Sequence, residues 1–161
     1  MVCFIGHRVI ERTKELEFLL KETILALLKK GVTTFLFGSM SEFNCLSWEV
    51  VTELKKEYPY IKRVYVRSAY QYLDKAYETY LLQFYEETYF PQRLEKAGRC
   101  VYVERNYEMI DRSSYCVFYY NENYVALSKR PALFSSKRNS GTKLAYTYAI
   151  KKKKQSINLY K

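Results

Sequence analysis

Short apolar runs alternate along this chain with longer segments in which apolar residues recur every three or four positions. Five of the runs have the length and the continuous apolar character of strands that are buried on both faces, at residues 2–5, 34–37, 64–66, 116–119 and 157–159. Strands and helices that alternate with short connections form a mostly parallel sheet covered by helices on both faces. The pattern therefore predicts one α/β domain that spans residues 1–161.

The segments between the predicted strands have the periodicity of amphipathic helices. Residues 16–28 form the first, and Gly31 is expected to end it in a left-handed conformation. Residues 43–54 form the second, which is expected to end near Pro59. A third is expected around residues 73–84.

Tyrosine is frequent in the middle of the chain, where residues 58–124 contain fifteen of the 18. Aromatic residues at helical spacing usually belong to a core, and we expect this of Tyr77, Tyr80 and Phe84. The others are too many for one core, so some are expected to line a pocket or a subunit interface. A homodimer is therefore a candidate assembly.

Two regions interrupt the alternation of strands and helices. Residues 86–99 are expected to form a surface excursion around Pro91, and the chain is expected to rejoin the sheet near residues 100–103. Residues 121–140 form a long basic loop, for which a binding lid and disorder are both open interpretations.

Composition favours a cytoplasmic protein. No signal-peptide pattern is present, and the apolar runs are too short to cross a bilayer. The cysteines are widely spaced and are expected to be reduced and mostly buried, at Cys3, Cys45, Cys100 and Cys116. With a single histidine they match no usual zinc-site spacing, so neither a metal nor a cofactor is expected.

The net charge of +10 is concentrated in the last quarter of the chain. Residues 1–122 carry 17 basic and 17 acidic side chains, whereas residues 123–161 carry ten basic side chains and no acidic one. A concentrated positive field attracts phosphates or nucleic acid, although charge runs are often only solvated surfaces. Both interpretations remain open.

Candidate ligand groups follow the predicted strands. Ligands of an open parallel sheet bind beyond the carboxyl ends of its strands, and helices that begin there present free N–H groups to anions. Arg8 and Arg105 are suited to grip a phosphate, although Arg105 could instead pair with Glu108 or Asp111 on the surface. Glu42 could act as a base or stabilise the first turn of its helix. No complete G-x-G-x-x-G or P-loop motif is present.

The motifs around these residues resemble those of the SLOG family. They are CFIGHR at residues 3–8, FGSMSEFN at 37–44, ERNYEMID at 104–111 and SGT at 140–142. Nearly the whole chain is similar, in particular to a bacterial and phage branch related to the YpsA proteins. The resemblance implies a Rossmann-like, three-layer α/β/α sandwich. It also implies a nucleotide or nucleotide-derived ligand, which some relatives hydrolyse to base and ribose phosphate.

The chain departs from the pattern of the hydrolases in that superfamily. Those enzymes carry a P-G-G-x-G-T loop followed by a glutamate in the next helix. Only Ser140, Gly141 and Thr142 remain of that loop here, and no acidic residue follows them. The expected function is therefore binding or sensing of the ligand without catalysis.

Two alternatives remain, a nucleoside monophosphate N-glycosidase that uses Glu42 and a protein that binds single-stranded nucleic acid through its basic last quarter. The expected ligand-binding residues are Gly6, His7, Arg8, Gly38, Ser39, Ser41, Phe43, Arg105, Asn106, Asp111, Ser140, Gly141 and Thr142.

Overall fold

The computed structural model describes residues 1–124 and 140–161, so most of the predicted loop at 121–140 lies outside the described residues. The strands are β1 (Val2–Gly6), β2 (Thr34–Phe37), β3 (Lys62–Val66), β4 (Glu87–Tyr89), β5 (Tyr115–Tyr119) and β6 (Gln155–Asn158). The helices are α1 (Lys14–Lys29), α2 (Glu42–Glu57), α3 (Lys75–Leu82), α4 (Val101–Arg112) and α5 (Gly141–Lys151). The short 3₁₀ helices η1 (Gln92–Lys96) and η2 (Gly98–Cys100) precede α4.

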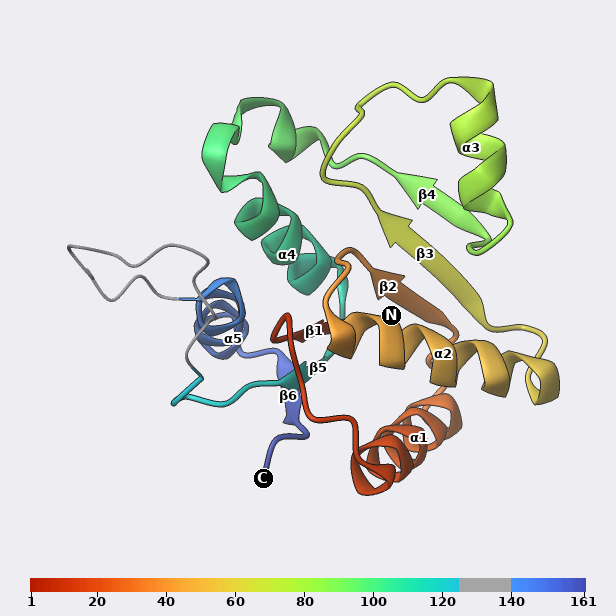
Figure 1. Cartoon of the computed structure of the whole chain (residues 1–161), viewed down its shortest axis with the longest axis vertical. Helices are drawn as coiled ribbons and strands as arrows, with labels where there is room; N and C mark the ends of the chain where they lie inside the picture. The colour runs from red at the N-terminus through yellow and green to blue at the C-terminus, as the bar shows by residue number, and fades with distance from the viewer. Residues whose placement is uncertain (125–139) are drawn as a thin grey trace.

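The six strands form one all-parallel sheet in the order β4-β3-β2-β1-β5-β6. Helices α1 and α2 cover one face and α4 and α5 cover the other (Figure 1). The fold is therefore the predicted Rossmann-like, three-layer α/β arrangement. The five strands that the apolar runs predicted are all present.

Side chains of the central strand alternate between the two cores. Val2 and Phe4 pack with α1 and α2, whereas Cys3 and Ile5 pack with α4 and α5. Successive residues of a strand point to opposite faces, so a strand with a helical layer on each side must be apolar throughout. This requirement explains why the runs could be recognised without an alternating pattern.

Local signals in the sequence fix several of the helix ends. The hydroxyl of Thr13 accepts from the Leu16 N–H, and Asp74 caps α3 in the same way. Gly31 has a φ of +80° just after α1, as predicted. A glycine is favoured there because other residues rarely adopt that conformation.

Three local predictions were wrong. Residues 100–103 belong to η2 and α4 rather than to a strand, because Arg105, Met109 and Ile110 form the buried face of one helix. The predicted excursion at 86–99 contains the edge strand β4, which has only three residues and no continuous apolar run. A short run cannot be assigned by periodicity alone.

The third error concerns the aromatic residues of the third helix. The relative exposures of Tyr77, Tyr80 and Phe84 are 36%, 53% and 37%, so they lie outside the core. Helix α3 has eight residues and buries only Leu81. It lies beside β3 and the edge strand β4 instead of over the middle of the sheet (Figure 1), which leaves most of its surface in solvent.

The cysteines form no disulfide, and two of the four are buried. Cys3 and Cys116 lie in the core, Cys45 is partly buried and Cys100 is exposed. Burial raises the pKa of the Cys3 thiol. None of the helices in the described part of the chain is long and apolar enough to cross a membrane.

A close contact between β1 and α2 depends on Gly6. A Cβ at Gly6 would lie 2.5 Å from the Phe43 ring, which is fully buried. Even a methyl group is too large for this space, and overpacking a rigid core is destabilising.

We predict that Gly6→Ala lowers the free energy of unfolding by about 1–3 kcal/mol, measured by urea denaturation. Gly141→Ala is the matched control, because its Cβ would meet no atom within 4 Å. The control should change the free energy by less than about 0.5 kcal/mol. Equal effects of the two substitutions would contradict the contact.

Candidate functional site

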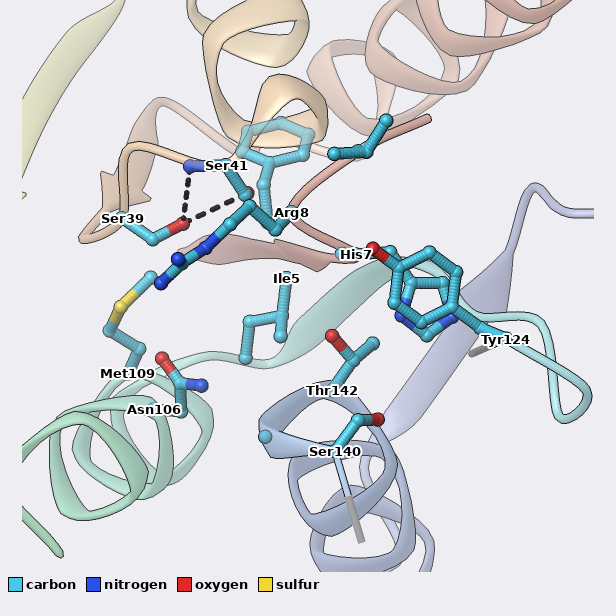
Figure 2. Close-up of a pocket in the computed structure, with 14 residues that line it drawn as sticks. Ile5, His7, Arg8, Ser39, Ser41, Asn106, Met109, Tyr124, Ser140 and Thr142 are labelled. Atoms are coloured by element: carbon cyan, nitrogen blue, oxygen red, sulfur yellow. Dashed lines mark hydrogen bonds between the residues drawn. The ribbon is translucent and has the colours of Figure 1, made fainter. Parts of the chain in front are cut away.

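The order of the strands reverses at β1. From β1 the sheet grows through β2 and β3 to β4, and the chain then returns to place β5 on the other side of β1. Connections leave the two neighbouring strands in opposite directions at such a point, and a crevice opens beyond their carboxyl ends. A cavity of about 360 Å³ lies there, between the residues just before α2, the first residues of α5 and the middle of α4 (Figure 2).

The structure brings most of the predicted ligand-binding residues to this cavity. Nine of them line it: Gly6, His7, Arg8, Ser39, Ser41, Asn106, Ser140, Gly141 and Thr142. They come from four separate segments of the chain. The candidates outside the lining are Gly38, Glu42, Phe43, Arg105 and Asp111.

Glu42 and Phe43 have structural contacts at the start of α2. The Glu42 carboxylate accepts a hydrogen bond from the main-chain N–H of Ile10 at 2.9 Å, outside the cavity. Phe43 packs against Gly6 beneath the cavity. Glu42 therefore holds the segment that follows β1, as well as contributing an acidic charge to the first turn of α2.

Arg105 and Asp111 lie on α4 but have different environments. Arg105 is buried and donates to the Gly38 carbonyl and, at 3.3 Å, to Ser68 Oγ. Asp111 accepts from Arg93 and from the Tyr148 hydroxyl, each at 2.9 Å, away from the cavity. The alternative ion pair of Arg105 with Glu108 or Asp111 does not form, since Arg93 is the partner of Asp111.

Gly38 explains how Arg105 reaches this position. A Cβ at Gly38 would lie 2.8 Å from Arg105 Nε and 2.7 Å from the sulfur of Met109. The absence of a side chain therefore lets α4 pack directly against the end of β2. Gly38 shapes the wall of the cavity without lining it.

Two helices begin at the cavity, and serines cap both of them. Ser41 Oγ accepts from the Asn44 N–H at 3.2 Å, and Ser140 Oγ accepts from the Lys143 N–H at 3.1 Å. The first N–H groups of a helix have no partner within the helix. Those of Gly141 and Thr142 lie at the cavity together with the positive end of the α5 dipole.

His7 is buried in the wall of the cavity, where its ring stacks on Tyr124 with the centroids 3.8 Å apart. The main-chain N–H of Asn121 lies 2.9 Å from His7 Nε2, and the Asn121 carbonyl oxygen lies 3.1 Å from the same atom. An amide nitrogen always carries its proton and therefore needs an acceptor. Nε2 is thus the acceptor in the neutral ring, and Nδ1 carries the proton.

This tautomer leaves a hydrogen-bond donor on a cavity residue. His7 Nδ1 is buried and has no hydrogen-bond partner among residues 1–124 and 140–161. Figure 2 shows one ring nitrogen of His7 on the side of Thr142. Burial lowers the pKa of the imidazole below 6.5, so the ring is neutral at pH 7.

The described residues that line the cavity include no carboxylate. Arg8 is its charged side chain, and Figure 2 shows this side chain extending from β1 toward Ser39 and Met109. The sequence of residues 125–139 also contains no acidic residue. The cavity therefore presents hydrogen-bond donors and positive charge, which suit an anion.

Tyr124 is a cavity residue that the sequence analysis did not single out. It belongs to the tyrosines of residues 58–124 that are too many for one core. The sequence predicted only that some of these tyrosines line a pocket, and did not indicate which. Phe4, Ile5 and Val9 add apolar surface. Their apolar character indicated burial and gave no signal for a ligand.

The described residues contain no group of three or more His, Cys, Asp or Glu side chains that could hold a metal ion. The sequence matches no protein-family model, and comparison with curated proteins finds no match.

We predict that His7 titrates with a pKa below 6.5. It is the only histidine of the chain, so its Cε1 proton gives one unambiguous NMR signal in protein without a histidine tag. Because the unfolded chain binds this proton more readily, the free energy of unfolding should fall as the pH decreases below about 6.5. A midpoint at or above 6.5 would contradict the buried neutral ring.

Proposed function

We propose that this protein binds a nucleotide or a nucleotide-derived ligand in the cavity at the carboxyl edge of the sheet, without catalysis. The observation that carries the proposal is a lining with two helix starts, an arginine and a buried imidazole N–H but no carboxylate. Such a set of groups stabilises an anion, and no carboxylate of the described lining would repel it. The resemblance to the SLOG family agrees with this proposal.

The opening turn of α5 is the proposed phosphate site. Main-chain N–H groups of Gly141 and Thr142 would donate to phosphate oxygens, and the hydroxyl of Thr142 is available beside them. Hydrogen bonds to a charged group contribute about 1.5–3 kcal/mol each. The His7 N–H on the same side would donate to an acceptor of the ligand.

The apolar part of the lining would receive the rest of the ligand. Ile5, Val9 and Met109 form apolar surface, and the Tyr124 ring offers a face on which a base could stack. A volume of about 360 Å³ lies within the range of small-molecule sites, about 300–1,000 Å³. The mixture of a polar end and an apolar wall fits a nucleotide better than it fits a free inorganic ion.

The position of Glu42 argues against the glycosidase alternative. Cleavage of a glycosidic bond needs a carboxylate beside the reacting carbon. Glu42 lies outside the cavity lining and accepts from the Ile10 N–H. Because the described lining holds no carboxylate at all, we propose that the ligand leaves the site unchanged.

Isothermal titration calorimetry with a panel of nucleoside mono- and diphosphates tests the proposal. We predict binding by the native protein and a loss of about 10–100-fold in affinity for Arg8→Ala, which removes one charged donor. Chromatography of each mixture should recover the nucleotide intact.

Arg12→Ala is the matched control for the loss of one arginine. Arg12 is exposed and paired with Glu49, away from the cavity, so its removal should leave nucleotide affinity unchanged. A panel without a single binder would overturn the proposed function. Release of free base would overturn the statement that no catalysis occurs.

A further inference from the structure

Arg105 lies directly behind one wall of the cavity. Its side chain is 4% exposed and donates to the Gly38 carbonyl, to Ser68 Oγ and, at 3.2 Å, to Asn106 Oδ1. Two of these partners connect Arg105 to the cavity, because Gly38 directly precedes Ser39 and Asn106 is itself a lining residue. Both Ser39 and Asn106 line the cavity.

The positive charge of Arg105 has no negative partner in the described part of the chain. No described carboxylate pairs with it, and residues 125–139 contain no acidic residue. Burial raises the pKa of the Tyr65 phenol, which is therefore neutral at pH 7, and the Arg105 guanidinium carbon lies over the Tyr102 ring, 5.6 Å from its centroid. Arg105 Nε is also buried with no hydrogen-bond partner among residues 1–124 and 140–161.

A second buried arginine, Arg63, shows the usual arrangement. Arg63 is 9% exposed, and its guanidinium donates to both carboxylate oxygens of Glu86, at 3.2 and 2.7 Å. Burial of a charge without such a partner is costly. Burial lowers the pKa of Arg105 to about 10, and the group still carries its charge at pH 7.

We propose that the ligand carries two anionic groups and that the second one binds at the Ser39 and Asn106 side of the cavity, where its charge compensates Arg105. The inference rests on the proposed function and names the class of ligand, a nucleotide with two phosphate groups. The first phosphate would lie at the opening of α5, where Figure 2 shows Ser140 and Thr142 to the right of Ser39 and Asn106.

Arg105 also sets the orientation of Asn106. Because the amide oxygen of Asn106 accepts from Arg105, its NH₂ group remains as a donor. Figure 2 shows the amide nitrogen of Asn106 on the side that faces the cavity. Arg105 is thus a positioning residue, which acts on the ligand through Asn106 and through its charge.

Arg8 completes the second anion site. Its side chain extends toward Ser39 and Met109, and so lies on the same side of the cavity as Asn106 (Figure 2). One exposed and one buried guanidinium would then act on one anionic group, with the hydroxyl of Ser39 as a further donor. The α5 opening, by contrast, has main-chain N–H groups and hydroxyls.

Calorimetric titrations with AMP and ADP, in a buffer that contains EDTA, test this inference. We expect ADP to bind the native protein at least tenfold more tightly than AMP. In Arg105→Met the ratio of the two affinities should fall to about twofold or less, whereas Arg105→Lys should keep part of the preference. Arg12→Met removes an exposed arginine outside the cavity and should keep the native ratio.

Pyrophosphate and phosphate give a second comparison, which uses the native protein and does not depend on the folding of a variant. Pyrophosphate should raise the melting temperature at concentrations where phosphate has no effect. Equal affinities for AMP and ADP in the native protein, or an unchanged ratio in folded Arg105→Met, would overturn the inference and leave the proposed function standing. Failure of every nucleotide to bind would overturn both.

Discussion

The contact between Phe43 and Gly6 determines where α2 begins relative to the central strand. Because Gly6 has no side chain, the first turn of α2 packs directly against the end of β1. The main-chain N–H of Glu42 donates to the Arg8 carbonyl at 2.9 Å and the Glu42 carboxylate accepts from Ile10, so the segment after β1 is held to α2 as well. The start of α2 and the main chain of Arg8 are therefore fixed at the edge of the cavity.

On the other face of the sheet, the missing side chain of Gly38 likewise allows a helix to approach the end of a strand. It lets α4 approach the end of β2, and this approach buries Arg105 under the Gly38 carbonyl. The two glycines thus bring helices from both layers to the carboxyl ends of neighbouring strands. The cavity is what remains between these helices and the first turn of α5. Its positive character follows from the same packing, since helix starts and arginines meet there without a carboxylate.

The sequence was sufficient for the features that depend on neighbouring residues. Strands buried on both faces must be apolar throughout, and serines at Ser41 and Ser140 mark helix starts. Because parallel strands end at the same edge, the residues that follow them could also be grouped into one site. Eight of the predicted ligand-binding residues line the cavity for this reason, whereas Asn106 reaches it from the middle of α4, where the predicted strand does not exist.

The features that the sequence did not reveal depend on contacts between distant segments. The strand β4 exists through its pairing with β3 and has little apolar character of its own. The burial of Arg105 depends on how closely α4 approaches Gly38, and an arginine in a polar motif gives no sign of it. The stacking of Tyr124 on His7 likewise joins two segments that are 117 positions apart.

A crystal structure of the protein grown with ADP tests the account most directly. We predict one phosphate within hydrogen-bond distance of the Gly141 and Thr142 main-chain nitrogens and the other within reach of the Asn106 amide and the Arg8 guanidinium. Binding of the nucleotide elsewhere, for example on the lysines at 151–154, with the cavity free of it, would contradict the account.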